Sequence, residues 1–151
     1  MMNLFENLQL MHEAEENYYD PNNYIWDGKS EVPRDVVNVT IKDGVTDIDY
    51  YTFASCESLK EVNIPDSVTK IGDDGFAACV SLQNINIPNS VTEIGDATFE
   101  YCKSLQKVNI FNTKTKIGED AFSKCPNVKV YKNGKSNDHD NNDYDNTYDN
   151  I

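Results

Sequence analysis

The chain has 151 residues, of which 38% are hydrophobic, and its formal net charge is −13 at pH 7. This length fits one domain with short flanking segments. The excess of negative charge excludes a protein that binds nucleic acid directly through the phosphates, and it makes an acidic surface a candidate feature.

The first predicted element is an amphipathic helix over residues 4–17. Asn3 followed by Glu6 forms a capping pair at its start, and Asp20 before Pro21 stops it from continuing. We expect residues 1–35 to cover the exposed end of the structure that follows, because open ends of this kind need caps. A helix that binds a partner is the alternative. The apolar face of this helix consists of Leu4, Phe5, Leu8 and Met11.

The N-terminal segment also indicates where in the cell the protein is located. Residues 1–19 lack both the basic start and the unbroken apolar run of a secretory signal. No stretch of the chain is long and apolar enough to span a membrane. We therefore expect a cytoplasmic or otherwise intracellular protein with no membrane partner.

Residues 36–131 contain four repeats with a step of 23 residues. Each repeat is too short to bury its own apolar face, so repeats of this length stack on their neighbours as a solenoid. Equivalent positions then form columns along the stack. The clearest columns are Phe53, Phe76, Phe99 and Phe122; Cys56, Cys79, Cys102 and Cys125; and Ile48, Ile71, Ile94 and Ile117.

Each repeat predicts the same order of short elements. Val62-Asn63-Ile64 alternates apolar and polar residues, which is typical of a strand with one buried face, and Pro65 ends it. Residues 68–71 predict a second extended piece. The glycine shared by successive repeats, as at Gly72, suggests a turn with positive φ. The Phe-x-x-Cys-x-x-Leu segment predicts a short helical turn. The fold class is therefore an α/β repeat solenoid with a parallel sheet on one side and short helical turns on the other.

The four periodic cysteines occupy one site of the repeat, so we expect a buried column of reduced thiols. A zinc site needs Cys and His ligands that converge, and the two histidines, His12 and His139, lie in the flanks. We predict no metal site and no other cofactor.

The repeat resembles the BspA-type leucine-rich repeat. Residues 82–95 read Leu-Gln-Asn-Ile-Asn-Ile-Pro-Asn-Ser-Val-Thr-Glu-Ile-Gly, and residues 59–72 follow the same pattern. The resemblance covers residues 36–131. It implies a right-handed solenoid used for protein–protein contact, often in surface proteins and adhesins, although the chain shows no secretory leader.

Residues 132–151 are rich in Asn and Asp, and we expect a disordered acidic tail. The spacing of Asp138, Asp140, Asn142 and Asp149 is that of a calcium loop, but Asp143 replaces the required glycine. We therefore predict no calcium site in this tail.

No catalytic motif is present. The cysteines of the repeats have no histidine nearby in the sequence to act as a base, and no phosphate-binding loop, zinc-protease helix or nucleophile elbow occurs. We predict that the protein is not an enzyme.

The main functional hypothesis is a protein-interaction module that binds its partner through the strand side of the solenoid. A column of asparagines there, bordered by prolines and Phe111, offers polar groups beside an apolar edge. An equally simple interpretation is that these amides bond to one another and only stabilise the stack. The predicted partner-binding residues are Glu61, Asn63, Asn84, Asn86, Lys107, Asn109 and Phe111.

Two alternatives remain open. The chain could be an acidic inhibitor of the phage anti-nuclease type, whose carboxylates occupy the basic surface of a nucleic-acid-binding protein. Its acidic flank would be Glu13, Glu15, Glu16 and Asp20. The second alternative is a structural spacer, or a fragment of a larger repeat array.

Overall fold

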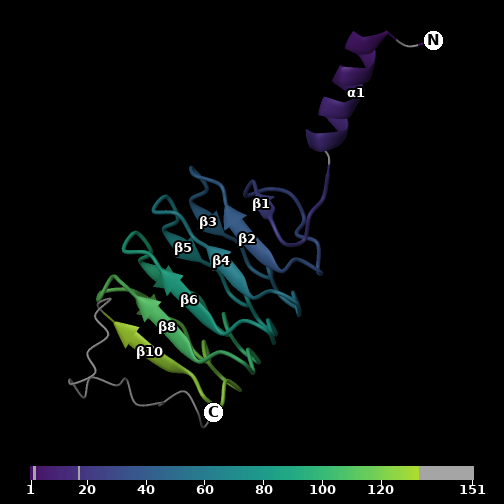
Figure 1. The fold of residues 1–151 in the computed structure, drawn as a ribbon. Coiled ribbons are helices and arrows are strands. Elements are labelled where there is room, and N and C mark those ends of the chain that lie inside the picture. Colours follow the sequence, from purple (N-terminus) through teal and green to yellow (C-terminus); the bar gives the residue numbers. More distant parts are fainter. Residues whose placement is uncertain (2, 17, 133–151) are drawn as a thin grey trace.

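The computed structural model describes residues 1, 3–16 and 18–132, and it is a parallel β-solenoid of stacked coils preceded by one helix, α1 (Leu4–Glu16) (Figure 1). Each full coil contributes one strand to the front of the view in Figure 1 and one to the back. The strands are β1 (Tyr24–Trp26), β2 (Asn38–Ile41), β3 (Asp47–Ile48), β4 (Glu61–Asn63), β5 (Lys70–Ile71), β6 (Asn84–Ile87), β7 (Glu93–Ile94), β8 (Lys107–Ile110), β9 (Lys116–Ile117) and β10 (Lys129–Lys132).

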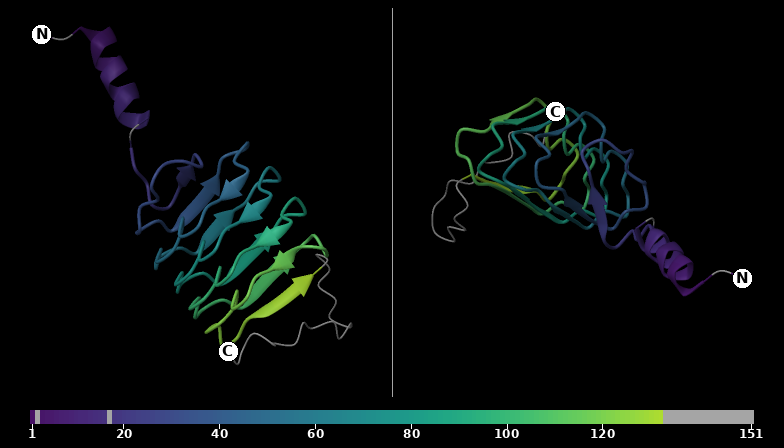
Figure 2. Two further views of the ribbon diagram at one scale, coloured as in Figure 1. Left: turned by 180° about the vertical axis from the view of Figure 1, so that it is seen from behind. Right: turned by 90° about the horizontal axis from the view of Figure 1, so that it is seen from above.

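The strands form two parallel arrays on different sides of the coils (Figure 2). We call the array of longer strands the strand face; it consists of the sheets β1-β2-β4 and β6-β8-β10. The other array is a single sheet in the order β3-β5-β7-β9, which we call the second sheet. All pairs are parallel, as the stacking of equivalent positions predicts.

The core is a stack of phenylalanine rings between the two arrays. The ring centroids of Phe53 and Phe76 lie 5.0 Å apart, and the next two steps to Phe99 and Phe122 are 5.4 and 5.5 Å. Successive ring planes differ by 8° or less. All four rings are fully buried, so the column predicted from the 23-residue step is confirmed.

The side of the coil that carries the Phe-Cys segment is not helical, which differs from the expectation. The described part of each coil here consists of turns, and residues such as Ala78 (φ 58°) and Tyr101 (φ 60°) adopt the left-handed conformation. This arrangement aims successive N–H groups at the next coil: Phe53 N–H donates to Gly75 (2.8 Å) and Phe76 N–H donates to Thr98 (2.9 Å). The turns therefore form a third ladder between coils, which a helix would not allow because its hydrogen bonds are internal.

The prediction of positive φ at the repeated glycine is wrong. Gly72, Gly95 and Gly118 all lie outside the positive-φ region. Glycine is needed here because coils approach closely: a Cβ at Gly95 would lie 2.6 Å from the backbone nitrogen of Asp73. The side chain of Asp73 occupies the space that a Cβ at Gly95 would need. Its Oδ1 accepts a hydrogen bond from Asp96 N–H at 2.8 Å.

The N-terminal helix forms with the predicted capping pair, since Glu6 N–H donates to Asn3 Oδ1 at 2.8 Å and Asn3 N–H donates to Glu6 Oε2 at 3.2 Å. The apolar face of this helix is exposed, and the helix stands away from the coils (Figure 1). The end of the stack is already covered by β1 and by Trp26, whose ring meets Phe53 edge-on at 5.3 Å. The exposed residues of α1 include Leu4, Phe5, Leu8 and Met11.

Candidate functional site

The strand face presents two outward columns of side chains, and these columns contain six of the seven predicted binding residues. Alternation along each strand puts every second side chain outside. The first column consists of Asn38, Glu61, Asn84, Lys107 and Lys129, and the second consists of Thr40, Asn63, Asn86, Asn109 and Tyr131.

Phe111, the seventh predicted residue, lies directly after β8. Its side chain is 41% exposed, and its N–H donates to the carbonyl oxygen of Ile87 at 3.1 Å. Proline at the equivalent positions Pro65 and Pro88 cannot make this bond. Replacement of proline by phenylalanine therefore adds one ladder bond and leaves an aromatic ring at the border of the strand face.

The amide column is only partly bonded to itself. Asn109 Nδ2 donates to Asn86 Oδ1 at 2.7 Å. Among the described residues, no corresponding bond joins Asn63 to Asn86, and the side chain of Asn84 has no hydrogen-bond partner. The interpretation of the column as a stabilising amide ladder therefore explains only the hydrogen bond between Asn86 and Asn109 among the described residues.

Sequence reasoning missed Lys129 and Tyr131 at the C-terminal end of this face. Counting 23 residues from Asn109 leads to Lys132, but β10 pairs with β8 in a register that places Tyr131 beside Asn109, a step of 22. The ammonium group of Lys107 lies 5.3 Å from the centroid of the Tyr131 ring. This contact gives the end of the face a basic and aromatic character that the rest of the column lacks.

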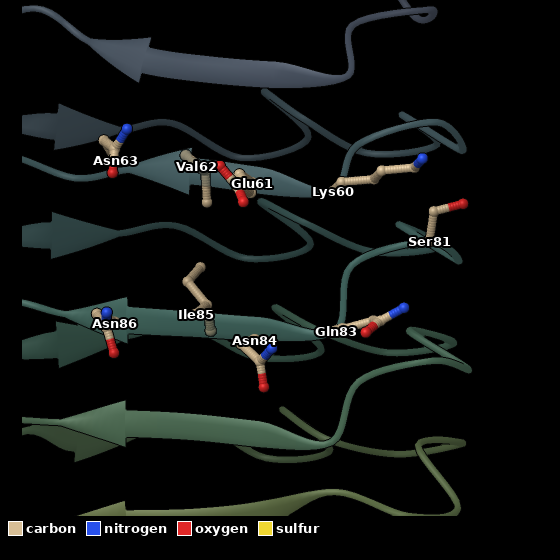
Figure 3. A pocket seen from close by; sticks show the side chains of 9 residues that line it. All are labelled: Lys60, Glu61, Val62, Asn63, Ser81, Gln83, Asn84, Ile85 and Asn86. Atoms are coloured by element: carbon tan, nitrogen blue, oxygen red, sulfur yellow. The ribbon is translucent and has the colours of Figure 1, made fainter. Parts of the chain in front are cut away.

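A cleft of about 390 Å³ opens between β4 and β6 in the middle of the strand face (Figure 3). Four of the predicted binding residues line it, and they come from two neighbouring coils. The polar lining includes Lys60, Glu61, Asn63, Gln83, Asn84 and Asn86.

The outward side chains of the second sheet bond to one another instead. The charged column there alternates in sign as Asp47, Lys70, Glu93 and Lys116, and Lys70 Nζ lies 3.4 Å from Glu93 Oε1. Opposite charges in register support pairing of neighbouring strands. A threonine column beside it donates to the preceding coil, as in Thr92 Oγ1 to the Thr69 carbonyl at 3.3 Å. Side chains on this sheet therefore stabilise the stack.

The cysteine column is buried and its four members are reduced cysteines, as expected. Cys79 Sγ donates to the Phe53 carbonyl and Cys102 Sγ to the Phe76 carbonyl, each at 3.1 Å. The neighbouring Cys102 thiol and burial raise the pKa of Cys79, and burial raises the pKa of Cys56. These thiols are protonated at neutral pH, which is the wrong form for a nucleophile or a metal ligand. Within the described ranges, no cluster of three potential ligands is placed to hold a metal ion.

Of the acidic flank in the alternative hypothesis, the structure describes only the side chain of Asp20. The side chains of Glu13, Glu15 and Glu16 lie outside the described residues, as does the whole tail after residue 132. Asp20 Oδ1 accepts a hydrogen bond from Asn22 N–H at 2.9 Å, which is a local turn contact. In the part of the chain that the structure describes, none of the helical segments has the length and apolar character needed to cross a bilayer.

Comparison with known proteins agrees with this geometry. A family model for the BspA type leucine rich repeat region matches residues 33–147 in six copies. The solved structure of a leucine-rich repeat protein from Bacteroides ovatus is 31% identical with a TM-score of 0.62; the match covers 72% of this chain but 30% of that one. A leucine-rich repeat protein of Treponema pallidum has the same fold, with 21% identity, a TM-score of 0.61 and coverage of 77% of this chain and 72% of that one. No curated protein matches the chain.

The present chain thus spans less than a third of the Bacteroides ovatus protein. The family match nevertheless covers most of its residues, and it includes every full coil of the solenoid. The chain therefore belongs to the BspA-type leucine-rich repeat family.

Proposed function

We propose that the chain is a non-catalytic module that binds a protein partner through the strand face. The observation that carries this proposal is the contrast between the two sheets. On the second sheet, Lys70 and Glu93 form an ion pair, and the threonines Thr69 and Thr92 donate hydrogen bonds to the neighbouring coil. On the strand face, Asn63 and Asn84 are exposed and make no side-chain hydrogen bond within the described chain. Polar groups that the fold does not use remain available to a ligand.

The distribution of charge along the face supports a polar partner surface. Glu61 lies second in the first column, next to Asn38, whereas Lys107 and Lys129 are its last two members at the C-terminal end. Tyr131 and the exposed ring of Phe111 lie at the same end. Aromatic side chains are enriched among the residues that dominate binding energy, and complementary charge speeds encounter. A partner that places carboxylates against Lys107 and Lys129 fits this end of the face.

The experiment compares two double-lysine variants of the full chain in capture of a partner from extracts of the native cell. Asn86→Lys with Asn109→Lys adds two charges to the strand face. Asn89→Lys with Thr113→Lys adds the same two charges at exposed loop positions off the face. We expect the first pair to lose the captured protein and the second pair to retain it, with unchanged circular dichroism in both. Equal capture by both variants would remove the strand face as the site.

A further inference from the structure

The apolar face of α1, formed by Leu4, Phe5, Leu8 and Met11, is exposed; each of these side chains is at least 55% exposed. A helix of 13 residues that packs on nothing is only marginally stable in water. Three of its last four residues are glutamates, and its last turn has no basic residue. Negative charge at this end opposes the helix dipole. A surface that stabilises α1 must therefore be apolar and must supply cations beside its C-terminal end.

The C-terminal end of the strand face has both properties. Lys107 and Lys129 are register partners on β8 and β10, and the ring of Phe111 is 41% exposed directly after β8. We call Lys107, Lys129, Tyr131 and Phe111 the basic aromatic patch. Its surroundings are also basic: residues 103–132 contain seven lysines and two acidic residues, whereas residues 1–28 contain six acidic residues and no lysine or arginine. The two ends of the molecule thus carry opposite charge.

The patch and α1 also match in length. The lysine pair and Phe111 stand at opposite ends of the patch, and Phe111 follows Lys107 by four residues, which is about 13 Å in an extended chain. On α1, the glutamates begin at position 13, eight residues after Phe5, which is a rise of about 12 Å along a helix. A helix laid along β8 therefore brings its apolar residues to the aromatic rings and its acidic end to the lysines.

The helix of the same chain cannot reach the patch in this orientation. The Pro21 carbonyl accepts from Val37 N–H and the Tyr19 hydroxyl donates to Asp35, each at 2.7 Å, and these bonds hold the chain at the N-terminal end of the stack. Only residues 17–18 separate α1 from this anchor, and they span at most about 7 Å. β8 stands four strands along the stack from β1, about 19 Å away, and β10 lies beyond it (Figure 1). The match is therefore to a second copy.

We propose that α1 of one copy docks on the basic aromatic patch of a second copy, so that copies of the chain associate head to tail. The apolar face of α1 covers the rings of Phe111 and Tyr131, and its glutamates face Lys107 and Lys129. Each copy has one helix and one patch, so the contact repeats from copy to copy. A single helix buries little surface, which makes the association weak and reversible. This inference rests on the proposed function, since it names the protein that brings carboxylates to the two lysines.

Sedimentation velocity of the full chain over a series of concentrations tests the association. We expect the unchanged chain to sediment faster as its concentration rises at low salt. The effect should be smaller at high salt, because salt screens the attraction between carboxylates and lysines. An unchanged chain that stays monomeric at every concentration would overturn the proposal.

A variant of the helix and its matched control test the apolar face. Leu8→Gln removes one side chain from this face and should weaken the association about tenfold or more. Leu10→Gln should leave it unchanged, because Leu10 is 49% exposed and the helical repeat places it on the opposite side of α1. Glutamine and leucine have similar helix propensities, so neither change should unfold α1. Equal weakening by the two changes would show that this face does not dock.

A variant of the patch has a control of the same charge. Lys107→Glu with Lys129→Glu reverses the charge of the patch and should abolish the association. The two lysines are already a like-charged pair, so pairing of β8 with β10 should change little. Lys103→Glu with Lys124→Glu changes the net charge equally at exposed positions of the turn side and should keep the association. Equal loss in both variants would mean that the overall charge and not the patch governs it.

Mixing the two variants identifies the head-to-tail contact. The helix variant Leu8→Gln keeps an intact patch, and the patch variant Lys107→Glu/Lys129→Glu keeps an intact helix. At a concentration at which neither associates alone, the mixture should contain pairs of copies. A mixture that stays monomeric would overturn the proposal, and it is the result expected if α1 pairs with α1 of another copy.

The outcomes separate this inference from the proposed function. If the strand-face variant Asn86→Lys/Asn109→Lys loses the captured protein while the unchanged chain stays monomeric, the partner site stands and the head-to-tail contact is overturned. If the mixture forms pairs while capture survives in that variant, the head-to-tail contact stands and the captured protein binds elsewhere on the chain.

Discussion

Arg34 Nη1 lies 2.7 Å from the carbonyl oxygen of Ala54, at the N-terminal end of the turn-side ladder. In the next coil the equivalent carbonyl, that of Ala77, accepts from the N–H of Ser55 at 2.8 Å. In the described structure no further coil stacks on this side to donate an N–H to the Ala54 carbonyl. The guanidinium of Arg34 donates the hydrogen bond in its place. It also reaches the Thr52 carbonyl at 3.4 Å, which is the equivalent of Gly75.

Replacement of Arg34 by methionine should lower the free energy of unfolding by about 1–2 kcal/mol, since hydrogen bonds to charged groups are worth about that much at a partly solvated site. The loss is expected because the carbonyls of Thr52 and Ala54 would then depend on water. The matched control is Lys29→Met, which removes an exposed cation of the same N-terminal segment. Urea unfolding measures both, and equal stability of the two variants would show that Arg34 does not cap the ladder.

The phenylalanine stack should dominate the stability of the solenoid. Phe76 lies between two rings, at 5.0 and 5.4 Å, and is fully buried. Phe76→Ala is expected to cost about 3–5 kcal/mol, the usual range for removing a buried aromatic ring. Phe111→Ala removes an exposed ring and should change the free energy of unfolding by about 0.5 kcal/mol or less. Similar costs for the two variants, measured by denaturant unfolding, would contradict the stacked core.

The features that follow from periodicity could be predicted from the sequence. A step of 23 residues places Phe53 and Phe76 in one column, and alternation within β4 and β6 places Asn63 and Asn86 outside. Both statements need only that equivalent residues of successive coils stack. The stacked core and most of the candidate site could therefore be predicted from the sequence alone.

The departures from periodicity could not be predicted from the sequence. Residues 59–64 and 82–87 follow the same pattern of apolar and polar positions, so nothing in them indicates that β4 and β6 do not pair. The left-handed conformation of Ala78 and Tyr101 is rare for such residues, and it is held by the ladder between coils instead of by local preference. The 22-residue step that brings Tyr131 beside Asn109 likewise depends on strand pairing.

The buried thiol of Cys79 should make stability depend on pH in the alkaline range. The neighbouring Cys102 thiol and burial raise the pKa of Cys79 above its ordinary value of 9.0. The folded state then holds its proton while the unfolded chain releases it, so the contribution is complete below pH 9 and falls as pH rises. Each such thiol adds a slope of about 1.4 kcal/mol per pH unit.

Cys79→Ser should reduce this slope, because a hydroxyl does not titrate in that range, while it can still donate to the Phe53 carbonyl. The measurement is the free energy of unfolding in urea at several pH values from about 8 to 10.5, compared with the unchanged chain. Tyrosines and lysines titrate equally in both proteins, so the difference in slope isolates the thiol. Parallel pH profiles would mean that Cys79 ionises as readily in the folded as in the unfolded state.

The open junction between β4 and β6 predicts that proline is tolerated better at Asn84 than at Lys107. The two residues are register partners in neighbouring strands, so a fixed φ should cost each of them a similar amount. Lys107 N–H donates to the Gln83 carbonyl at 3.2 Å, whereas Asn84 N–H has no backbone partner in the described structure. Only Lys107→Pro therefore removes a ladder bond, and its free energy of unfolding should be lower than that of Asn84→Pro by about 1 kcal/mol.

Hydrogen exchange of the unchanged chain provides the second measurement of the same feature. The amides of Gln83 and Asn84 should exchange faster than those of Gln106 and Lys107, since exchange of a bonded amide requires local opening and that of a free amide does not. Equal protection of all four amides, together with equal cost of the two prolines, would mean that β4 and β6 pair in solution like every other junction of the strand face.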